Sequence, residues 1–270
     1  MKNKIDAAVI GCGAMGGAVV SCLLNPTTAA VLKASGSVLR VTACDTDEAK
    51  LMPFKGRCAV TLSAAQATAN CDCVIVALPC AAAPALSQLN LDGKFVISLM
   101  AGVTTDALSS LAPRGKIVRA MPNLNATVGE SFTAYCATAL SESDKRIVEQ
   151  ILGSLGAFEE MPERDIEAAT GLAGCAPAFV FSAIEAFCAE AEARGFAPEL
   201  AKRMAVQAFY GSALCAERYD GALDALISDV ATPGGATAAG LKVLRDGEFK
   251  NTLRGAISAA IARAEEMRNG

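Results

Sequence analysis

A glycine-rich turn near the start of the chain constrains the fold more than any other feature. Ala7–Ile10 is a short apolar run typical of a β-strand, Gly11-Cys-Gly-Ala-Met-Gly16 follows at once, and an apolar helical stretch runs from Ala18 to Leu24. This is G-x-G-x-x-G in its required context of strand, turn and helix. The three glycines permit the tight turn, the approach of a pyrophosphate, and close packing of helix on strand. The pattern predicts a dinucleotide-binding unit; the alternative is a glycine turn of purely structural use.

An acidic residue follows the second predicted strand. Val38–Cys44 ends at Asp45, where a carboxylate can accept hydrogen bonds from the adenosine ribose hydroxyls. Asp45 lies 29 residues after Gly16 (45 − 16), more than the usual spacing of roughly 20. A polar loop at 25–28 can absorb the excess. We expect cofactor contacts at Gly11, Cys12, Gly13, Ala14, Met15 and Asp45.

Three more apolar runs predict buried parallel strands: 73–77, 95–99 and 116–120. Ligands of such sheets bind beyond the carboxyl ends of the strands. We therefore expect cofactor contacts at Ala77, Leu78, Pro79 and Ala101, and a substrate contact at Asn123. Taken singly, each of these turns is better explained as an ordinary connection between strand and helix.

The rest of the chain is predicted to be helical. After Met161-Pro162 the helical patterns run over 164–173, 177–193, 198–217 and 249–267, and Ser141 is expected to cap an earlier helix. The helix from Pro177 is apolar on several sides and must be buried, either in a large core or against another subunit. We expect an intertwined homodimer, with internal burial as the alternative. The predicted fold is a Rossmann-type doubly wound α/β domain, residues 1–162, followed by an all-α dimerisation domain, residues 163–270.

A second glycine turn lies in the helical part. In Asp229-Val-Ala-Thr-Pro-Gly-Gly-Ala-Thr-Ala-Ala-Gly-Leu241, two hydroxyls flank Pro-Gly-Gly and a helical pattern follows. The first N–H groups of a helix have no internal partner and bind anions. The segment predicts a pocket for a small carboxylate; the alternative is a loop that ends in an ordinary threonine cap.

Net charge, apolar runs and cysteine usage exclude several classes of function. Net charge is −4 without a basic block, which argues against nucleic-acid binding. No run of 18 apolar residues lacks a break, so no transmembrane helix is expected, and Met1–Lys4 leaves no room for a signal peptide before the first strand. The eleven cysteines are scattered without metal-ligand spacing, which favours reduced thiols in a cytoplasmic protein and no metal site.

The chain contains no histidine, which excludes histidine-dependent alcohol dehydrogenation and Ser-His-Asp hydrolysis. A reaction whose substrate supplies its own proton is then favoured. Reduction of a protonated imine fits, because the iminium already carries the charge that hydride transfer needs.

These motifs resemble the pyrroline-5-carboxylate reductase family over nearly the whole chain. The resemblance rests on the first glycine turn, Val76–Pro79, Ser98–Val103, Arg119–Asn123, Thr170–Gly174 with Pro177-Ala178, and above all on Asp229–Leu241. It implies NAD(P)H-dependent reduction of 1-pyrroline-5-carboxylate to proline, and dimers that often assemble into decamers. It also implies substrate contacts at Thr232, Gly234, Gly235, Ala236 and Thr237, with Thr237 as the catalytic hydroxyl that contacts the ring nitrogen.

Several departures from the family pattern leave the substrate open. Thr232 stands where serine is usual, Leu124-Asn125 replaces Thr-Pro, and Ala173-Gly-Cys-Ala-Pro177 replaces Ser-Gly-Ser-Gly-Pro. The alternatives are a reductase of a related imine or oxo acid, and a non-catalytic dinucleotide-binding sensor. Asp45-Thr-Asp-Glu48 places three carboxylates where a 2′-phosphate would lie, which predicts NADH over NADPH, unless these acids only form a solvated turn and helix start.

Overall fold

The computed structural model describes residues 4–28, 30 and 38–269. It divides into two compact units, Met1–Cys175 with Ala260–Gly270, and Ala176–Ala259. The expectation about Met1–Lys4 falls largely outside the described residues.

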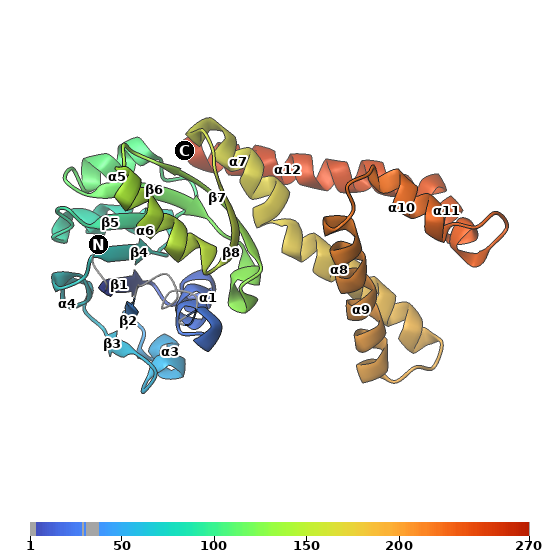
Figure 1. The fold of residues 1–270 in the computed structure, drawn as a ribbon, viewed down its shortest axis with the longest axis horizontal. Coiled ribbons are helices and arrows are strands. Elements are labelled where there is room, and N and C mark those ends of the chain that lie inside the picture. Colours follow the sequence, from blue (N-terminus) through green and yellow to red (C-terminus); the bar gives the residue numbers. More distant parts are fainter. Residues whose placement is uncertain (1–3, 29, 31–37, 270) are drawn as a thin grey trace. The chain divides into compact units, whose positions relative to one another are not determined.

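The first unit is built on an eight-stranded sheet in the order β3-β2-β1-β4-β5-β6-β7-β8 (Figure 1). Neighbouring strands are parallel except for the antiparallel pair β6 and β7. The strands are β1 (Lys4–Ile10), β2 (Val38–Cys44), β3 (Ala59–Thr61), β4 (Cys73–Val76), β5 (Phe95–Ser98), β6 (Lys116–Met121), β7 (Ser131–Ala137) and β8 (Gly156–Glu160). The sheet confirms the Rossmann-type doubly wound prediction.

Helices cover both faces of this sheet. They are α1 (Ala14–Leu23), α3 (Glu48–Leu51), α4 (Ala64–Ala69), α5 (Thr105–Leu111), α6 (Glu142–Gly153) and α7 (Ile166–Ala169). Successive strand side chains point to opposite faces, so Ala7 and Val9 join one apolar cluster with residues of α1 and α6, while Ala8 and Ile10 join another with residues of α4 and α5. Burial on both faces explains why these strands are almost continuously apolar.

The strands predicted from apolar runs are confirmed to within about one residue, apart from the first, which begins earlier, at Lys4. Three strands were not predicted: β3, β7 and β8. Ser141 caps α6 as expected, because its Oγ accepts from the N–H of Asp144 at 3.2 Å. The prediction of one continuous helix over 164–173 was wrong. The segment consists of a 3₁₀ turn (Glu163–Asp165), the short α7 and a π-helical turn (Thr170–Gly174).

The second unit is helical. It contains α8 (Ala176–Ala193), α9 (Pro198–Glu217), α10 (Leu223–Val230), α11 (Ala236–Asp246) and the first part of α12 (Phe249–Asn269), whose end belongs to the first unit. Helices α8 and α9 pack together, with the rings of Phe187 and Phe209 edge to face at 5.2 Å between centroids. In the single chain, Pro177 is the one buried residue of α8, so most of the apolar surface of this helix is exposed.

An 18-residue window within the helical stretch Glu163–Ala193 has a mean hydropathy of 1.7, so the stretch is long and apolar enough to cross a membrane by length and composition alone. The expectation of no transmembrane helix stays a prediction, because length and composition alone do not distinguish a membrane span from the core helix of a soluble protein. A helix buried between subunits has the same composition.

Candidate functional site

The glycine turn after β1 is shaped by close backbone contacts. Gly11 has φ +91°, and a Cβ added there would lie 2.5 Å from the carbonyl oxygen of Ala77. A Cβ on Gly16 would lie 1.7 Å from the carbonyl oxygen of Gly11, whereas one on Gly13 would meet no described atom within 4 Å. Gly13 begins α1 without a side-chain cap, so the N–H groups of the first turn are available to an anion. This is a cradle that fits a pyrophosphate.

The strand register gathers the expected cofactor residues at one edge of the sheet. Ile10 pairs with both Cys44 and Val76, and Val76 pairs with Ser98, so these four strands end at the same level. The residues that follow them therefore lie along one edge: the glycine turn with Cys12, Ala14 and Met15; Asp45; Ala77, Leu78 and Pro79; and Ala101. The topology brings together residues that lie up to 90 positions apart (101 − 11).

Asp45 is buried and faces the glycine turn. One carboxylate oxygen accepts from the N–H of Cys12 at 2.7 Å, and the other accepts from the N–H of Asp47 at 2.9 Å. Burial alone would raise the pKa of Asp45, but the backbone hydrogen bonds of Asp47 and Cys12, and Lys50 with its Nζ at 3.8 Å, hold that pKa below its usual value. Asp45 is therefore a fixed anion beside the turn.

The other two acidic residues of this segment, Asp47 and Glu48, lie at the start of α3. Asp47 caps the helix by accepting from the N–H of Ala49, and Glu48 pairs with Lys55 at 2.8 Å. Both are exposed. Burial raises the pKa of the Cys12 thiol to about 11, with the charge of Asp45 adding to the effect, so this cysteine stays protonated at neutral pH.

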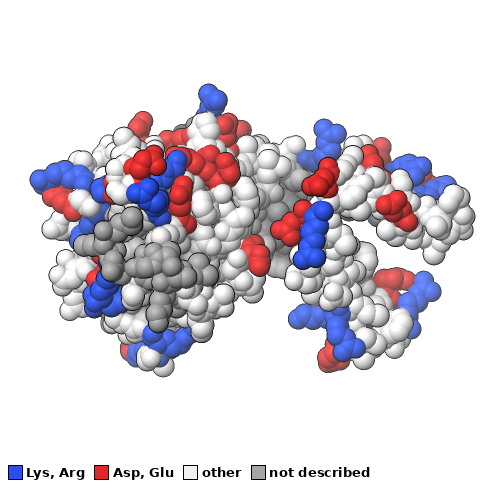
Figure 2. Space-filling model, in the orientation of Figure 1, with Lys and Arg blue, Asp and Glu red and all other residues white. Residues whose placement is uncertain are grey.

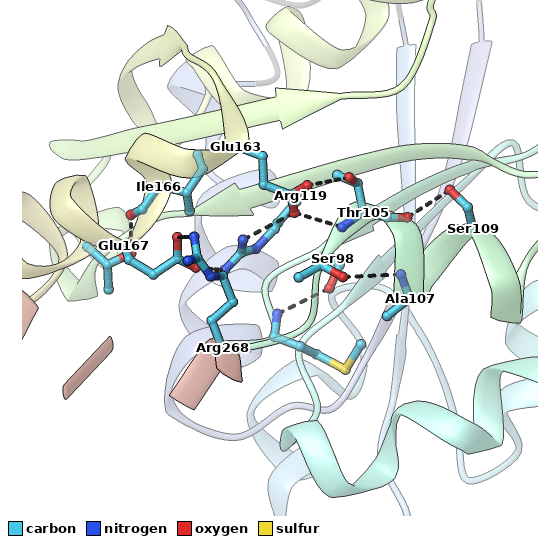
Figure 3. A network of polar contacts seen from close by, with 12 residues as sticks. Ser98, Thr105, Ala107, Ser109, Arg119, Glu163, Ile166, Glu167 and Arg268 are labelled. Atoms are coloured by element: carbon cyan, nitrogen blue, oxygen red, sulfur yellow. Dashed lines mark hydrogen bonds and ion pairs between the residues drawn. The ribbon is translucent and has the colours of Figure 1, made fainter. Parts of the chain in front are cut away.

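A buried charge network lies beside this edge (Figure 3). Arg119 of β6 is 1% exposed and donates to Glu163 at 3.2 Å and to Glu167 at 2.6 Å. Glu163 also accepts from the N–H and the hydroxyl of Thr105, at 2.7 and 2.5 Å, and Arg268 of α12 donates to Glu167 at 3.1 Å. The network thus joins the sheet, the start of α5, α7 and the end of α12.

Sequence reasoning did not select Glu163, Glu167 or Arg268. A signal was present, because Arg119 interrupts an otherwise apolar strand, and a buried arginine needs carboxylate partners. The sequence did not indicate which carboxylates these are.

Asn123, expected to contact substrate, is buried and makes three hydrogen bonds within the first unit. Its Nδ2 donates to the carbonyl of Ala173 at 3.0 Å, and its Oδ1 accepts from the N–H of Asn125 at 3.0 Å. Its own N–H donates to the hydroxyl of Ser131 at 2.9 Å.

The remaining expected substrate residues form the entry to α11 in the second unit. Gly234 has φ +73°, which favours glycine, and the N–H of Gly235 donates to the carbonyl of Thr232 at 3.0 Å. The Thr232 hydroxyl lies 2.6 Å from the place of a Cβ on Gly235, so a side chain there would displace it. Helix α11 begins at Ala236 without a side-chain cap, and Thr237 in its first turn is exposed. Uncapped N–H groups with hydroxyls on both sides suit a carboxylate.

Comparisons with known proteins agree with this arrangement. Residues 163–267 match the sequence model of the pyrroline-5-carboxylate reductase dimerisation family, and residues 6–102 match that of the NADP oxidoreductase, coenzyme F420-dependent, family. The chain is 35% identical to the pyrroline-5-carboxylate reductase of Aquifex aeolicus over 201 residues, which is 73% of this chain and 76% of that one. It is 35% identical to the Arabidopsis thaliana enzyme of that name over 175 residues, 64% of this chain and 63% of the other.

Solved structures give the same result. Plasmodium falciparum pyrroline carboxylate reductase with NADP bound superposes with a TM-score of 0.85 at 26% identity, covering 98% of both chains. The Coxiella burnetii pyrroline-5-carboxylate reductase gives a TM-score of 0.82 at 28% identity, covering 97% of this chain and 98% of that one. A reductive aminase from Aspergillus terreus in complex with NADPH shares the fold, with a TM-score of 0.57 at 19% identity over 99% of this chain and 95% of that one.

Proposed function

Because this chain belongs to the pyrroline-5-carboxylate reductase family, we propose that it reduces the C=N bond of 1-pyrroline-5-carboxylate to give proline. The observation that carries the proposal is the edge of the sheet where the glycine turn, Asp45 and Ala77 meet, since it fits a dinucleotide. A nicotinamide dinucleotide bound there supplies the hydride.

The protein's own residues then bind and orient the substrate. The N–H groups at the start of α11 and the hydroxyl of Thr232 hold the carboxylate, with Gly234, Gly235 and Ala236 leaving room for it. The hydroxyl of Thr237 orients the ring nitrogen. No histidine is needed, because the iminium substrate brings its proton and the product amine retains it.

A panel of imines tests this proposal. The purified protein is mixed with NADH or NADPH, and absorbance at 340 nm is followed with 1-pyrroline-5-carboxylate and with cyclic imines of other ring size or without the carboxylate. Turnover confined to 1-pyrroline-5-carboxylate supports the proposal. Faster turnover of another imine supports the second candidate, a related imine reductase, which the changed segment Ala173–Ala176 favours. Binding of cofactor without turnover of any imine would overturn both.

We also propose that NADH is the preferred cofactor. Asp45 is held as an anion at the turn and would repel a 2′-phosphate, whereas both ribose hydroxyls of NADH can donate to it. Two observations oppose this preference: a solved relative holds NADP, and Lys50 approaches Asp45. The ratio of kcat/KM for the two cofactors, measured in parallel, decides between them.

The proposed working form is a homodimer in the cytoplasm, and dimers can assemble further into a decamer. The exposed apolar surface of α8 and α9 supports self-association, and eleven unpaired thiols suit a reducing compartment. On the face drawn in Figure 2, Lys and Arg side chains are interspersed with Asp and Glu, as expected for a protein that does not bind nucleic acid.

A further inference from the structure

The entry to α8 contains a backbone carbonyl that lacks its usual α-helical donor. Pro177 lies in the first turn of α8 and has no N–H, so the carbonyl of Ala173, four residues earlier, lacks its α-helical donor. The preceding residues form a π-helical turn, in which the N–H of Cys175 donates to the carbonyl of Thr170 at 2.9 Å. Such turns are rare and occur frequently at functional sites.

Asn123 supplies the missing donor from another element. Its Nδ2 reaches the Ala173 carbonyl at 3.0 Å, across 50 residues of sequence. Its Oδ1 is fixed by the N–H of Asn125, so the amide has one orientation and its donor points at the π-helical turn. A polar backbone group left unpaired in a partly buried site destabilises the folded state.

The π-helical turn borders the cofactor edge of the sheet. Thr170 and Cys175 line a cavity of about 180 Å³ together with Ala101 and Gly102, which follow β5. On the side before the turn, Glu167 of α7 is held by Arg119 (Figure 3). The Arg119–Glu167 pair therefore holds the chain before the turn, and Asn123 holds the turn at Ala173.

We propose that Asn123 is a positioning residue. By donating to the carbonyl of Ala173, which Pro177 leaves without an α-helical donor, it holds the turn Thr170–Gly174 beside Ala101 and Gly102, the residues that follow β5. Its effect on catalysis passes through the backbone of Ala173, in place of the direct substrate contact expected from the sequence. The catalytic part of this inference rests on the proposed reductase function; the structural part does not.

Asn123→Asp removes the donor but retains the acceptor for Asn125. The matched control is Asn90→Asp, because Asn90 is exposed and its Oδ1 likewise accepts from an N–H two residues on, that of Asp92. We expect kcat/KM for the imine to fall about 10-fold in Asn123→Asp, the scale of one buried hydrogen bond, while KM for NADH changes by less than about twofold. The control should match the wild type in both. If the wild type reduces the imine and Asn123→Asp has the same kcat/KM, the proposal is overturned.

Hydrogen exchange tests the clamp without any activity. Exchange of the Cys175 amide, and of the peptide 170–178, should accelerate about 10-fold in Asn123→Asp and remain unchanged in Asn90→Asp. This result is expected even if the protein fails to reduce any imine, which separates failure of the proposed function from failure of the clamp. Equal exchange in both variants and the wild type would overturn the proposal.

Pro177→Ala provides a rescue experiment, because it restores an N–H that can donate to the Ala173 carbonyl. In this background, the additional loss caused by Asn123→Asp should shrink from about 10-fold to about twofold. An equal loss in both backgrounds would show that Asn123 acts independently of this carbonyl and would overturn the proposal.

Discussion

At the scale of single residues, the carboxylate of Asp45 has two roles, and both depend on its negative charge. It fixes the glycine turn by accepting from the N–H of Cys12. Its charge also acts on the group bound at the ribose position of the cofactor. Because its hydrogen bonds keep it ionised, an incoming 2′-phosphate cannot be accommodated by protonating it at neutral pH. The choice of cofactor therefore depends on whether Lys50 offsets that charge.

Asp45→Asn tests this choice. The amide keeps the size of the side chain and one acceptor oxygen but removes the negative charge. We expect the NADPH/NADH ratio of kcat/KM to rise about 10-fold, within the range of one close like-charge contact. Asp47→Asn is the matched control, since Asp47 is exposed and engaged in capping α3, and it should leave the ratio unchanged. A ratio that is the same in both variants would show that Asp45 does not face the ribose.

Thr237 is predicted to be the catalytic hydroxyl. Thr237→Ala should lower kcat/KM for the imine by about 10- to 100-fold, the scale of one or two hydrogen bonds made in the transition state. Thr237→Ser retains the hydroxyl and should recover most of the rate. NADH affinity, measured by fluorescence titration, should be unchanged in both variants, because Thr237 lies in the second unit and the dinucleotide turn in the first. Wild-type turnover by the alanine variant would exclude this role.

At the scale of elements, the sequence predicted what depends on local patterns. The central strands are buried on both faces, so their apolar runs were sufficient, and the glycine turn placed α1. Strands β7 and β8 were missed because they carry polar residues such as Thr133 and Glu159, and form only by pairing with each other and with β6. The carboxylate partners of Arg119 lie 44 and 48 residues away in the sequence, so no local pattern encodes them.

Glu163 links β6 to the start of α5 through its bonds to Arg119 and Thr105, and its titration should affect stability. Burial alone would raise the pKa of Glu163, but hydrogen bonds from Thr105 and the charge of Arg119 hold that pKa below its usual value. A carboxylate with a lowered pKa in the folded state stabilises the protein above the unfolded pKa of about 4.5, and that contribution is lost as pH falls through the folded value.

Glu163→Gln should therefore lower Tm clearly at pH 7, and the difference from the wild type should shrink as pH falls below about 4.5. The physical reason is that the wild type loses the same charge on protonation. Glu159→Gln is the control, because Glu159 is exposed, and its Tm should follow the wild type throughout. Thermal unfolding followed by circular dichroism over pH 3–7 measures this. A difference that stays constant with pH would assign the effect to lost packing.

At the scale of the whole molecule, the second unit does not bury its own apolar side chains. Large apolar residues are exposed along its helices in the single chain, among them Val180, Phe181, Met204, Val206, Tyr210, Leu223, Ile227 and Val243. Its residues lie within the match to a dimerisation family, and a monomer seldom exposes so many large apolar side chains on one small helical unit. Self-association is the arrangement that removes this surface from water.

Phe181→Glu should weaken the dimer without affecting the dinucleotide turn. Phe181 is 51% exposed in the single chain. If the exposed apolar face of α8 forms the interface, a carboxylate there would be buried without a partner, and we expect the dimer dissociation constant to rise at least about 100-fold. Sedimentation velocity at micromolar concentration should show a dimer for the wild type and monomer for the variant, while NADH affinity stays the same. Val38→Glu, at an equally exposed apolar position of the first unit, is the control and should remain dimeric. A wild type that sediments as a monomer, or a Phe181→Glu variant that stays dimeric, would show that this face of α8 is not the interface.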